Sequence, residues 1–236
     1  GELSAEGGRY GSRQLAGNVG GGNDTVDFNL SGADFRTDGF NARSTDTALR
    51  DDDGYDNTTA NARLGYNPTD KLRLTVVGRS VDGKNHYDDC YTADTYEPTD
   101  RCSDEYEQQA WRVAADYDAG SFTHQLAYNG SDTDHSFYSA GESGFRARGE
   151  LERTGYLGSF SAGDALRLVY GVDLETESLD DGSTDASRNQ DGYYFEYQGG
   201  FGNRLFVTAG TRYDDNDDFG SHTSYRVSAA WLWMPC

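Results

Sequence analysis

The sequence is short of the residues that build a water-soluble core or a membrane-spanning helix. Only 35% of its 236 residues are hydrophobic, and no stretch approaches the roughly 20 consecutive apolar residues of a membrane helix. Basic residues are also scarce, 20 against 41 acidic ones, which gives a formal net charge of −21. An acidic chain without a basic patch is a poor nucleic-acid binder, so no nucleic-acid partner is expected. Aromatic residues reach 13%, which argues against the disorder that low hydrophobicity and high charge alone would indicate.

Cysteine is rare as well. Cys90 and Cys102 lie close together in one acidic, tyrosine-rich segment, while Cys236 has no evident partner. A loop closed by a Cys90–Cys102 disulfide fits an oxidising compartment such as the periplasm or the cell surface. A zinc site is weakly supported, because no Cys or His pair elsewhere completes the ligand set.

Motifs of enzymes are missing too. The sequence has no nucleophile elbow, phosphate-binding loop or dinucleotide fingerprint. Pairs of acidic residues occur throughout, so they do not single out a general acid and base. We therefore predict no catalytic residue and no enzymatic activity.

What the chain does have is a two-residue alternation of apolar and polar side chains. The alternation is seen in four segments, Leu72–Val76, Leu166–Val172, Leu205–Tyr213 and Tyr225–Trp233. A period of two predicts β-strands with two different faces. About twelve strands are expected, near residues 2–10, 12–20, 24–36, 57–67, 71–82, 106–118, 121–131, 149–161, 165–177, 191–201, 204–214 and 222–233.

The connections between these strands alternate in length. Short turns rich in Gly, Asn and Asp, such as Asp118-Ala-Gly120, alternate with long polar segments. The long segments are expected near residues 37–57, 82–105, 130–148, 176–191 and 214–222. Strands of ten or more residues with short turns at one end and long loops at the other are typical of an antiparallel up-and-down outer-membrane β-barrel.

The two faces fit such a barrel. One face would meet lipid through residues such as Leu74, Val76 and Leu126, and the other, with Arg63, Arg112 and other charged or small residues, would line a polar lumen. Aromatic residues near strand ends suit interfacial girdles. A soluble β-sandwich would instead expose the polar face to solvent, but soluble strands usually run to about 5–6 residues.

Four segments carry a resemblance to a known family. They are Leu3-Ser-Ala-Glu-Gly-Gly-Arg-Tyr-Gly-Ser12, Asp27-Phe-Asn-Leu30, Asn61-Ala-Arg-Leu-Gly-Tyr66 and Arg212-Tyr-Asp-Asp-Asn-Asp-Asp-Phe-Gly220. In order and spacing the chain resembles the barrel of TonB-dependent outer-membrane receptors, and among them the cobalamin (vitamin B12) receptors. The resemblance implies a location in the bacterial outer membrane and a role in the uptake of cobalamin or another small chelate.

The chain also departs from that family. The family's plug domain and TonB-binding segment are not in this sequence, and its barrels have 22 strands. We therefore expect residues 1–236 to form a single truncated barrel domain, the first half of such a barrel, without TonB as a partner. An even strand number lets the first and last strands pair, so closure into a small barrel is favoured over an open sheet whose edges associate with a second copy.

Acidic residues cluster in two of the long loops. Such a set can supply the six to eight oxygen ligands of Ca²⁺, although an ordinary solvated acidic loop is the alternative. The resemblance implies calcium ligands at Asp51, Asp53, Asp88, Asp100 and Asp104. Tyr87, Tyr91 and Tyr96 are the candidate ligand-binding residues, and their alternative role is that of ordinary surface tyrosines.

Three functions remain in view. The first is a receptor or transporter barrel that, as it stands, acts at most as a passive pore or as a scaffold for ligand-binding loops, surrounded by outer-membrane lipid. The second is a small β-barrel pore or scaffold, natural or engineered, without a specific ligand. The third is a soluble all-β binding module.

Overall fold

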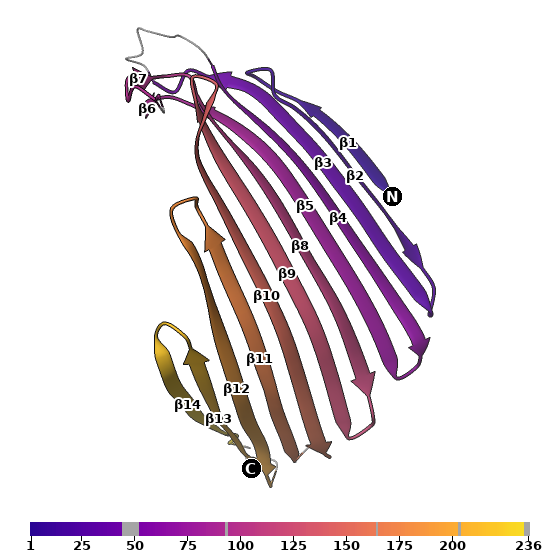
Figure 1. Ribbon diagram of the computed structural model, residues 1–236. Coiled ribbons are helices and arrows are strands. Elements are labelled where there is room, and N and C mark those ends of the chain that lie inside the picture. Colours follow the sequence, from indigo (N-terminus) through magenta and orange to yellow (C-terminus); the bar gives the residue numbers. More distant parts are fainter. Residues whose placement is uncertain (44–51, 93, 164, 203, 234–236) are drawn as a thin grey trace.

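The protein is a single large β-sheet with one small hairpin at its upper end (Figure 1). The computed structural model describes residues 1–43, 52–92, 94–163, 165–202 and 204–233. Twelve antiparallel strands follow one another in the sheet in the order of the chain, and β6 and β7 pair separately. Within these residues, no helix has the length and apolar character needed to cross a membrane.

The strands of the main sheet are long. Their bounds are β1 (Glu2–Gly7), β2 (Arg13–Gly22), β3 (Val26–Phe40), β4 (Asp53–Thr69), β5 (Leu72–Tyr87), β8 (Cys102–Asp118), β9 (Phe122–Ser139), β10 (Glu142–Ala162), β11 (Leu166–Asp180), β12 (Asp185–Phe201), β13 (Leu205–Asn216) and β14 (Gly220–Trp231). The small hairpin comprises β6 (Cys90–Tyr91) and β7 (Pro98–Thr99). The twelve predicted strands are therefore confirmed, and the sheet is of the up-and-down type.

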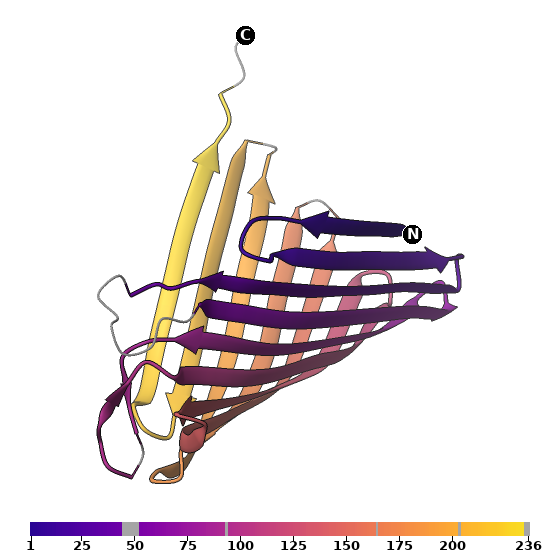
Figure 2. The same ribbon diagram turned by 90° about the horizontal axis from the view of Figure 1, so that it is seen from above.

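The strand register places the apolar and polar residues on opposite faces. Val76 pairs with Val113 and Leu126 with Ala115, so the apolar positions of neighbouring strands lie side by side. On the other face Arg73 pairs with Asp116, and Asp116 with Gln125. We call the first face the outer face and the second the inner face, because the sheet curls around the second (Figure 2).

The outer face has no protein partner among the described residues. Leu126 is 54% exposed, and Val76 and Val113 are nearly as exposed. Only Val81, Cys102, Ala114 and Ala127 are buried hydrophobic residues in the part of the chain that the structure describes. A sheet with so little core needs an apolar solvent for its outer face, and hydrocarbon provides one. This exposure disfavours the soluble module.

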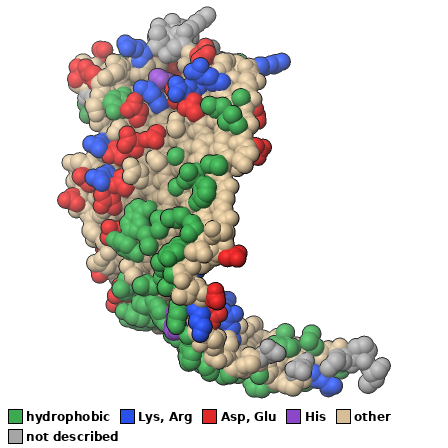
Figure 3. All heavy atoms as spheres, turned by 90° about the vertical axis from the view of Figure 1, so that its right-hand side faces the viewer, with side chains coloured by type: hydrophobic (Ala, Val, Ile, Leu, Met, Phe, Trp, Pro, Cys, Tyr) green, Lys and Arg blue, Asp and Glu red, His purple; other side chains and the backbone are tan. Residues whose placement is uncertain are grey.

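The outer face changes character along the strands. Near the short turns it is hydrophobic and aromatic, and toward the hairpin end it is charged. In Figure 3 hydrophobic side chains gather in the lower part of the convex side and charged side chains in its upper part. On β9, for example, Leu126 and Tyr128 give way to Asp132 and Asp134. A membrane-spanning strand needs about 9–11 residues, whereas β9 and β10 have 18 and 21. The upper half of the sheet therefore extends beyond the apolar belt.

This extension overturns three of the predicted loops. Most residues of three segments, 130–148, 176–191 and 214–222, belong to strands. In the first of them, β9 connects to β10 through the tight turn Ala140-Gly141, where both residues have a positive φ. Above the membrane both faces of the sheet meet water, so the alternation that reveals a strand disappears from the sequence. Cross-strand ion pairs such as Arg148–Asp132 (2.7 Å) stabilise this region instead.

The predicted closure is also wrong. Strands β1 and β14 are the two edges of the sheet and do not pair, and Figure 2 shows them well separated. Closing a barrel requires a matching strand tilt and stagger, and this sheet curves too gently for twelve strands to complete a circle. The structure is a partial barrel.

The opposite faces of β5 give a direct test of the membrane assignment. We expect Val76→Lys to destabilise the folded protein in lipid vesicles by about 2–4 kcal/mol, because an ammonium group would replace a methyl surface in hydrocarbon. Thr75→Lys, one residue earlier on the inner face, is the control and should cost much less. Urea titration of vesicle-refolded protein measures both, and equal losses in the two variants would contradict the assignment of faces.

Candidate functional site: the inner face and mouth of the sheet

The lower inner face is held together by arginines paired with carboxylates and amides from neighbouring strands. Asp27 on β3 accepts hydrogen bonds from Arg63 on β4 (2.9 Å) and Arg73 on β5 (2.6 Å). Farther along the sheet, Arg112 on β8 donates to Asn129 on β9 (2.8 Å). The Arg63 and Arg112 contacts join adjacent strands, whereas the Arg73 contact reaches from β5 across β4 to β3.

The ladder of contacts continues to the last strands. Asp173 on β11 lies 2.8 Å from Arg153 and 3.1 Å from Arg212, so one carboxylate joins β10 to β13. Arg226 on β14 pairs with Glu196 on β12. Partly exposed pairs contribute little stability individually, but their continuity makes the inner face a nearly charge-balanced polar wall.

The upper inner face carries an aromatic cluster made by Phe35, Tyr55, Tyr106, His135 and Phe137. The hydroxyls of Tyr55 and Tyr106 lie 2.8 Å apart, and the ring of Tyr106 meets that of His135 edge-on at 6.1 Å. Phe35 packs against Tyr55 at 6.1 Å, and Phe137 against His135 at 4.3 Å. These residues come from β3, β4, β8 and β9, so they form one continuous patch.

Polar groups accompany the aromatic cluster. The amide of Asn57 donates to the Tyr106 hydroxyl at 3.0 Å. Asp104 lies 3.0 Å from Nε2 of His135 and accepts a hydrogen bond from Asn85 at 3.2 Å. The patch thus combines flat apolar surfaces with amide, hydroxyl and carboxylate groups, the mixture that ligand sites commonly use.

A glycine on β5 makes the aromatic cluster continuous. Tyr106 on β8 reaches Tyr55 on β4 by crossing β5 at Gly83, which pairs with both Tyr106 and Asn57. A Cβ atom at Gly83 would collide with the Tyr106 ring. The absence of a side chain at this one position therefore lets the ring lie flat across the strand.

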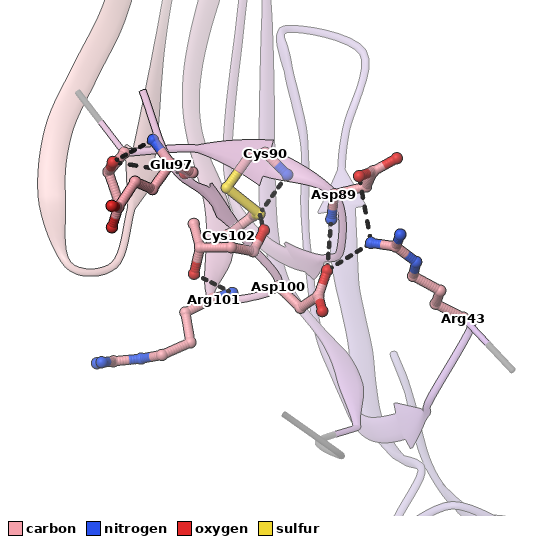
Figure 4. The surroundings of a disulfide bond; sticks show 9 residues. Arg43, Asp89, Cys90, Glu97, Asp100, Arg101 and Cys102 are labelled. Carbon is pink, nitrogen blue, oxygen red and sulfur yellow. Dashed lines mark hydrogen bonds and ion pairs between the residues drawn. A yellow bond between two sulfur atoms is a disulfide. The ribbon is translucent and has the colours of Figure 1, made fainter. Parts of the chain in front are cut away.

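The mouth of the sheet is formed by the β6–β7 hairpin and the loop that follows β3. Cys90 and Cys102 form a disulfide that ties the hairpin to the start of β8. Beside it, Arg43 lies 2.7 Å from Asp100 and 3.2 Å from Asp89, and so connects the loop after β3 to the hairpin (Figure 4). The carboxylates of Asp89 and Asp100 raise the pKa of Arg43 above its ordinary value.

The predicted tyrosines do not form one group. Tyr87 is half-buried at the upper end of β5, on the inner face beside Cys102. Tyr91 and Tyr96 lie on the hairpin, where they are 59% and 77% exposed. Sequence reasoning missed Tyr55, Tyr106 and His135, because a period of two shows which face a residue occupies but not which residues meet across three strands.

The predicted calcium ligands are likewise divided. Asp51 lies outside the described residues. Asp53 accepts a hydrogen bond from the Ala42 backbone amide at 2.6 Å, Asp100 faces Arg43, and Asp104 belongs to the aromatic patch. Asp88 contributes to the negative field around Arg43. Within the described ranges no three His, Cys, Asp or Glu residues are arranged to hold a metal ion, and the calcium site stays a prediction.

The role of Gly83 can be tested directly. We expect Gly83→Val to push the Tyr106 ring off β5 and break its hydrogen bonds to Tyr55 and Asn57, because the new side chain occupies the space under the ring. Gly78→Val on the same strand is the control, since a Cβ there meets nothing within 4 Å. Near-ultraviolet circular dichroism should lose tyrosine signal only in Gly83→Val, and an unchanged spectrum would contradict the packing described.

Comparison of sequences identifies one informative relative. The chain is 25% identical over 240 aligned positions to the vitamin B12 transporter BtuB of Photobacterium profundum, and the alignment covers 98% of this chain. It spans only 37% of that relative's length. No family model matches the chain.

Solved structures show the same architecture. The siderophore receptor PirA from Pseudomonas aeruginosa superposes with a TM-score of 0.73 at 16% identity, over 94% of this chain and 37% of that one. A variant of the ferric enterobactin receptor PfeA from the same organism superposes with a TM-score of 0.72 at 13% identity. The superposition covers 92% of this chain and 38% of that receptor. At these identities the likeness establishes the fold.

Both comparisons point to the same class of protein. The relatives are bacterial outer-membrane receptors, which is the location that the sequence predicts. The gentle curvature that prevents closure is also explained, since the chain corresponds to somewhat more than a third of each relative. The chain thus resembles, over nearly its whole length, the barrel of TonB-dependent outer-membrane receptors.

Proposed function

We propose that this chain forms part of the wall and mouth of an outer-membrane uptake receptor for a small ligand. The observation that carries the proposal is the two-faced sheet, whose outer face suits lipid while its inner face carries a polar ladder and an aromatic patch below a disulfide-linked mouth. A wall built for permeability alone needs no patch of interlocked aromatic rings. The likeness to receptors for vitamin B12 and siderophores supports the same proposal.

Cobalamin is the first candidate ligand. It is the ligand in the name of the sequence relative, and a large ring bearing amide groups suits a patch of aromatic and amide side chains. Tyr87 borders the aromatic cluster from above, and Tyr91 and Tyr96 would make the first contacts at the hairpin.

A passive pore or scaffold without a ligand is the second candidate. It is favoured by the open, charge-balanced lower inner face, which leaves room for water. The two candidates differ in one measurable property, the presence of saturable ligand binding.

Calcium binding at the mouth is a further part of the proposal. Asp89 and Asp100 flank the hairpin and already share one cation, the Arg43 guanidinium. A calcium ion drawn to these carboxylates would therefore compete with Arg43.

The competition predicts the effect of removing that arginine. We expect Arg43→Gln to raise the affinity of the mouth for Ca²⁺ about tenfold, which corresponds to 1.4 kcal/mol, because two carboxylates lose their counter-charge. Arg101→Gln, on an exposed residue that points away from the cluster (Figure 4), is the control. Calorimetric titration with CaCl₂ measures the affinity, and no binding by either variant would refute the calcium proposal.

Ligand binding itself is tested at Tyr106. The refolded chain in detergent should bind cyanocobalamin saturably, and Tyr106→Ala should weaken binding about tenfold, since the loss of a stacked ring and its hydrogen bonds costs of the order of 1–2 kcal/mol. Tyr213→Ala, on the outer face of β13, should leave the affinity unchanged. Fluorescence quenching reports the affinity, and an absence of saturable binding would favour the passive pore.

A further inference from the structure

Among the strand residues that the structure describes, the upper inner face carries no Lys or Arg. From the level of Gly83 upward, the inward-pointing residues of β3, β4, β5, β8 and β9 are all described, and none of them is Lys or Arg. The charged groups there are the carboxylates of Asp53 on β4 and of Asp104 on β8, the latter accompanied by His135. This is unexpected in a sheet whose lower inner face relies on arginine throughout.

The neighbouring cations are directed elsewhere. Lys84 is on the outer face and pairs with Glu105 at 2.8 Å. Arg43 at the mouth is shared by Asp89 and Asp100. The next inner-face cation along β5 is Arg79, four residues below Gly83 and hence about 13 Å away along the strand.

From this distribution we infer that the aromatic patch selects an uncharged or cationic ligand surface that is flat and rich in hydrogen-bonding groups, and rejects anionic chelates. An anion brought against the patch would lose its hydration and meet the carboxylate of Asp104. Among the described strand residues of the patch it would find no guanidinium or ammonium group in return. A neutral ring carrying amides would stack on Tyr106 and Tyr55 and exchange hydrogen bonds with Asn57 and Asn85. The inference rests on the proposed function and narrows its substrate class.

The geometry supports stacking in particular. Tyr55 and Tyr106 share a hydrogen bond and span β4 to β8 over Gly83, so their rings are held in place without a ligand. His135 is fixed between Tyr106, Phe137 and Asp104. A preorganised surface loses little side-chain entropy on binding, and this favours a rigid planar ligand.

Two probes of opposite character test the inference. Neutral cyanocobalamin and an anionic ferric tris-catecholate are titrated separately into the refolded chain in detergent at low ionic strength. We expect the neutral probe to bind at least tenfold more tightly. Equal or tighter binding of the anion would overturn the inference while leaving the receptor proposal intact, whereas binding of neither probe would overturn the receptor proposal.

A charge added to the patch should convert its preference. Gln108→Lys places a cation on the inner face of β8 beside Tyr106, and Thr133→Lys places one on the inner face of β9. Each variant should bind the anionic probe at least tenfold more tightly than the unmodified chain. Gln109→Lys, adjacent in sequence but on the outer face, is the matched control and should have no effect. An anion affinity that rises equally in Gln109→Lys would show a response to net charge alone and would refute the assignment to the patch.

Discussion

The backbone of this sheet has hydrocarbon on one side, so its peptide groups can be satisfied only by neighbouring strands. An unpaired amide or carbonyl in lipid costs several kcal/mol, and the up-and-down order gives every interior strand two antiparallel partners. Because the outer side chains bury themselves in lipid, the protein needs almost no core of its own, and very few of the described hydrophobic residues are buried. Strand length, face assignment and the polar inner wall all depend on this constraint.

The inner face follows from the same constraint. Side chains there cannot pack against a second layer, and they satisfy one another instead across the strands, as Asp173 does between Arg153 and Arg212. Glycine becomes useful in this setting, because a strand position without a side chain lets a neighbouring ring lie flat. Gly83 under Tyr106 does so on the inner face, and Gly130, where a Cβ would lie 2.6 Å from Trp111, does so on the outer one.

The alternation in the sequence was sufficient to predict the strands and their faces, since Leu74 and Val76 must point to the side opposite Arg73. The alternation was not sufficient where both faces of the sheet meet water. At Asp132 and Asp134 it disappears although β9 continues. Closure was wrongly expected because curvature depends on tilt and stagger, which no local pattern contains. The disulfide followed from two nearby cysteines, whereas the Tyr55–Tyr106 contact requires the register of three strands.

The central claim is that the outer face of the lower sheet meets lipid while its inner face meets water. Nitroxide labels placed singly along β5, from residue 72 to residue 87, test it most directly in vesicle-refolded protein. We predict that collision rates with oxygen peak at every second position from 72 to 78 and that this alternation fades above 80, where both faces meet water. Uniform access to a water-soluble collision reagent from 72 to 78 would contradict the account.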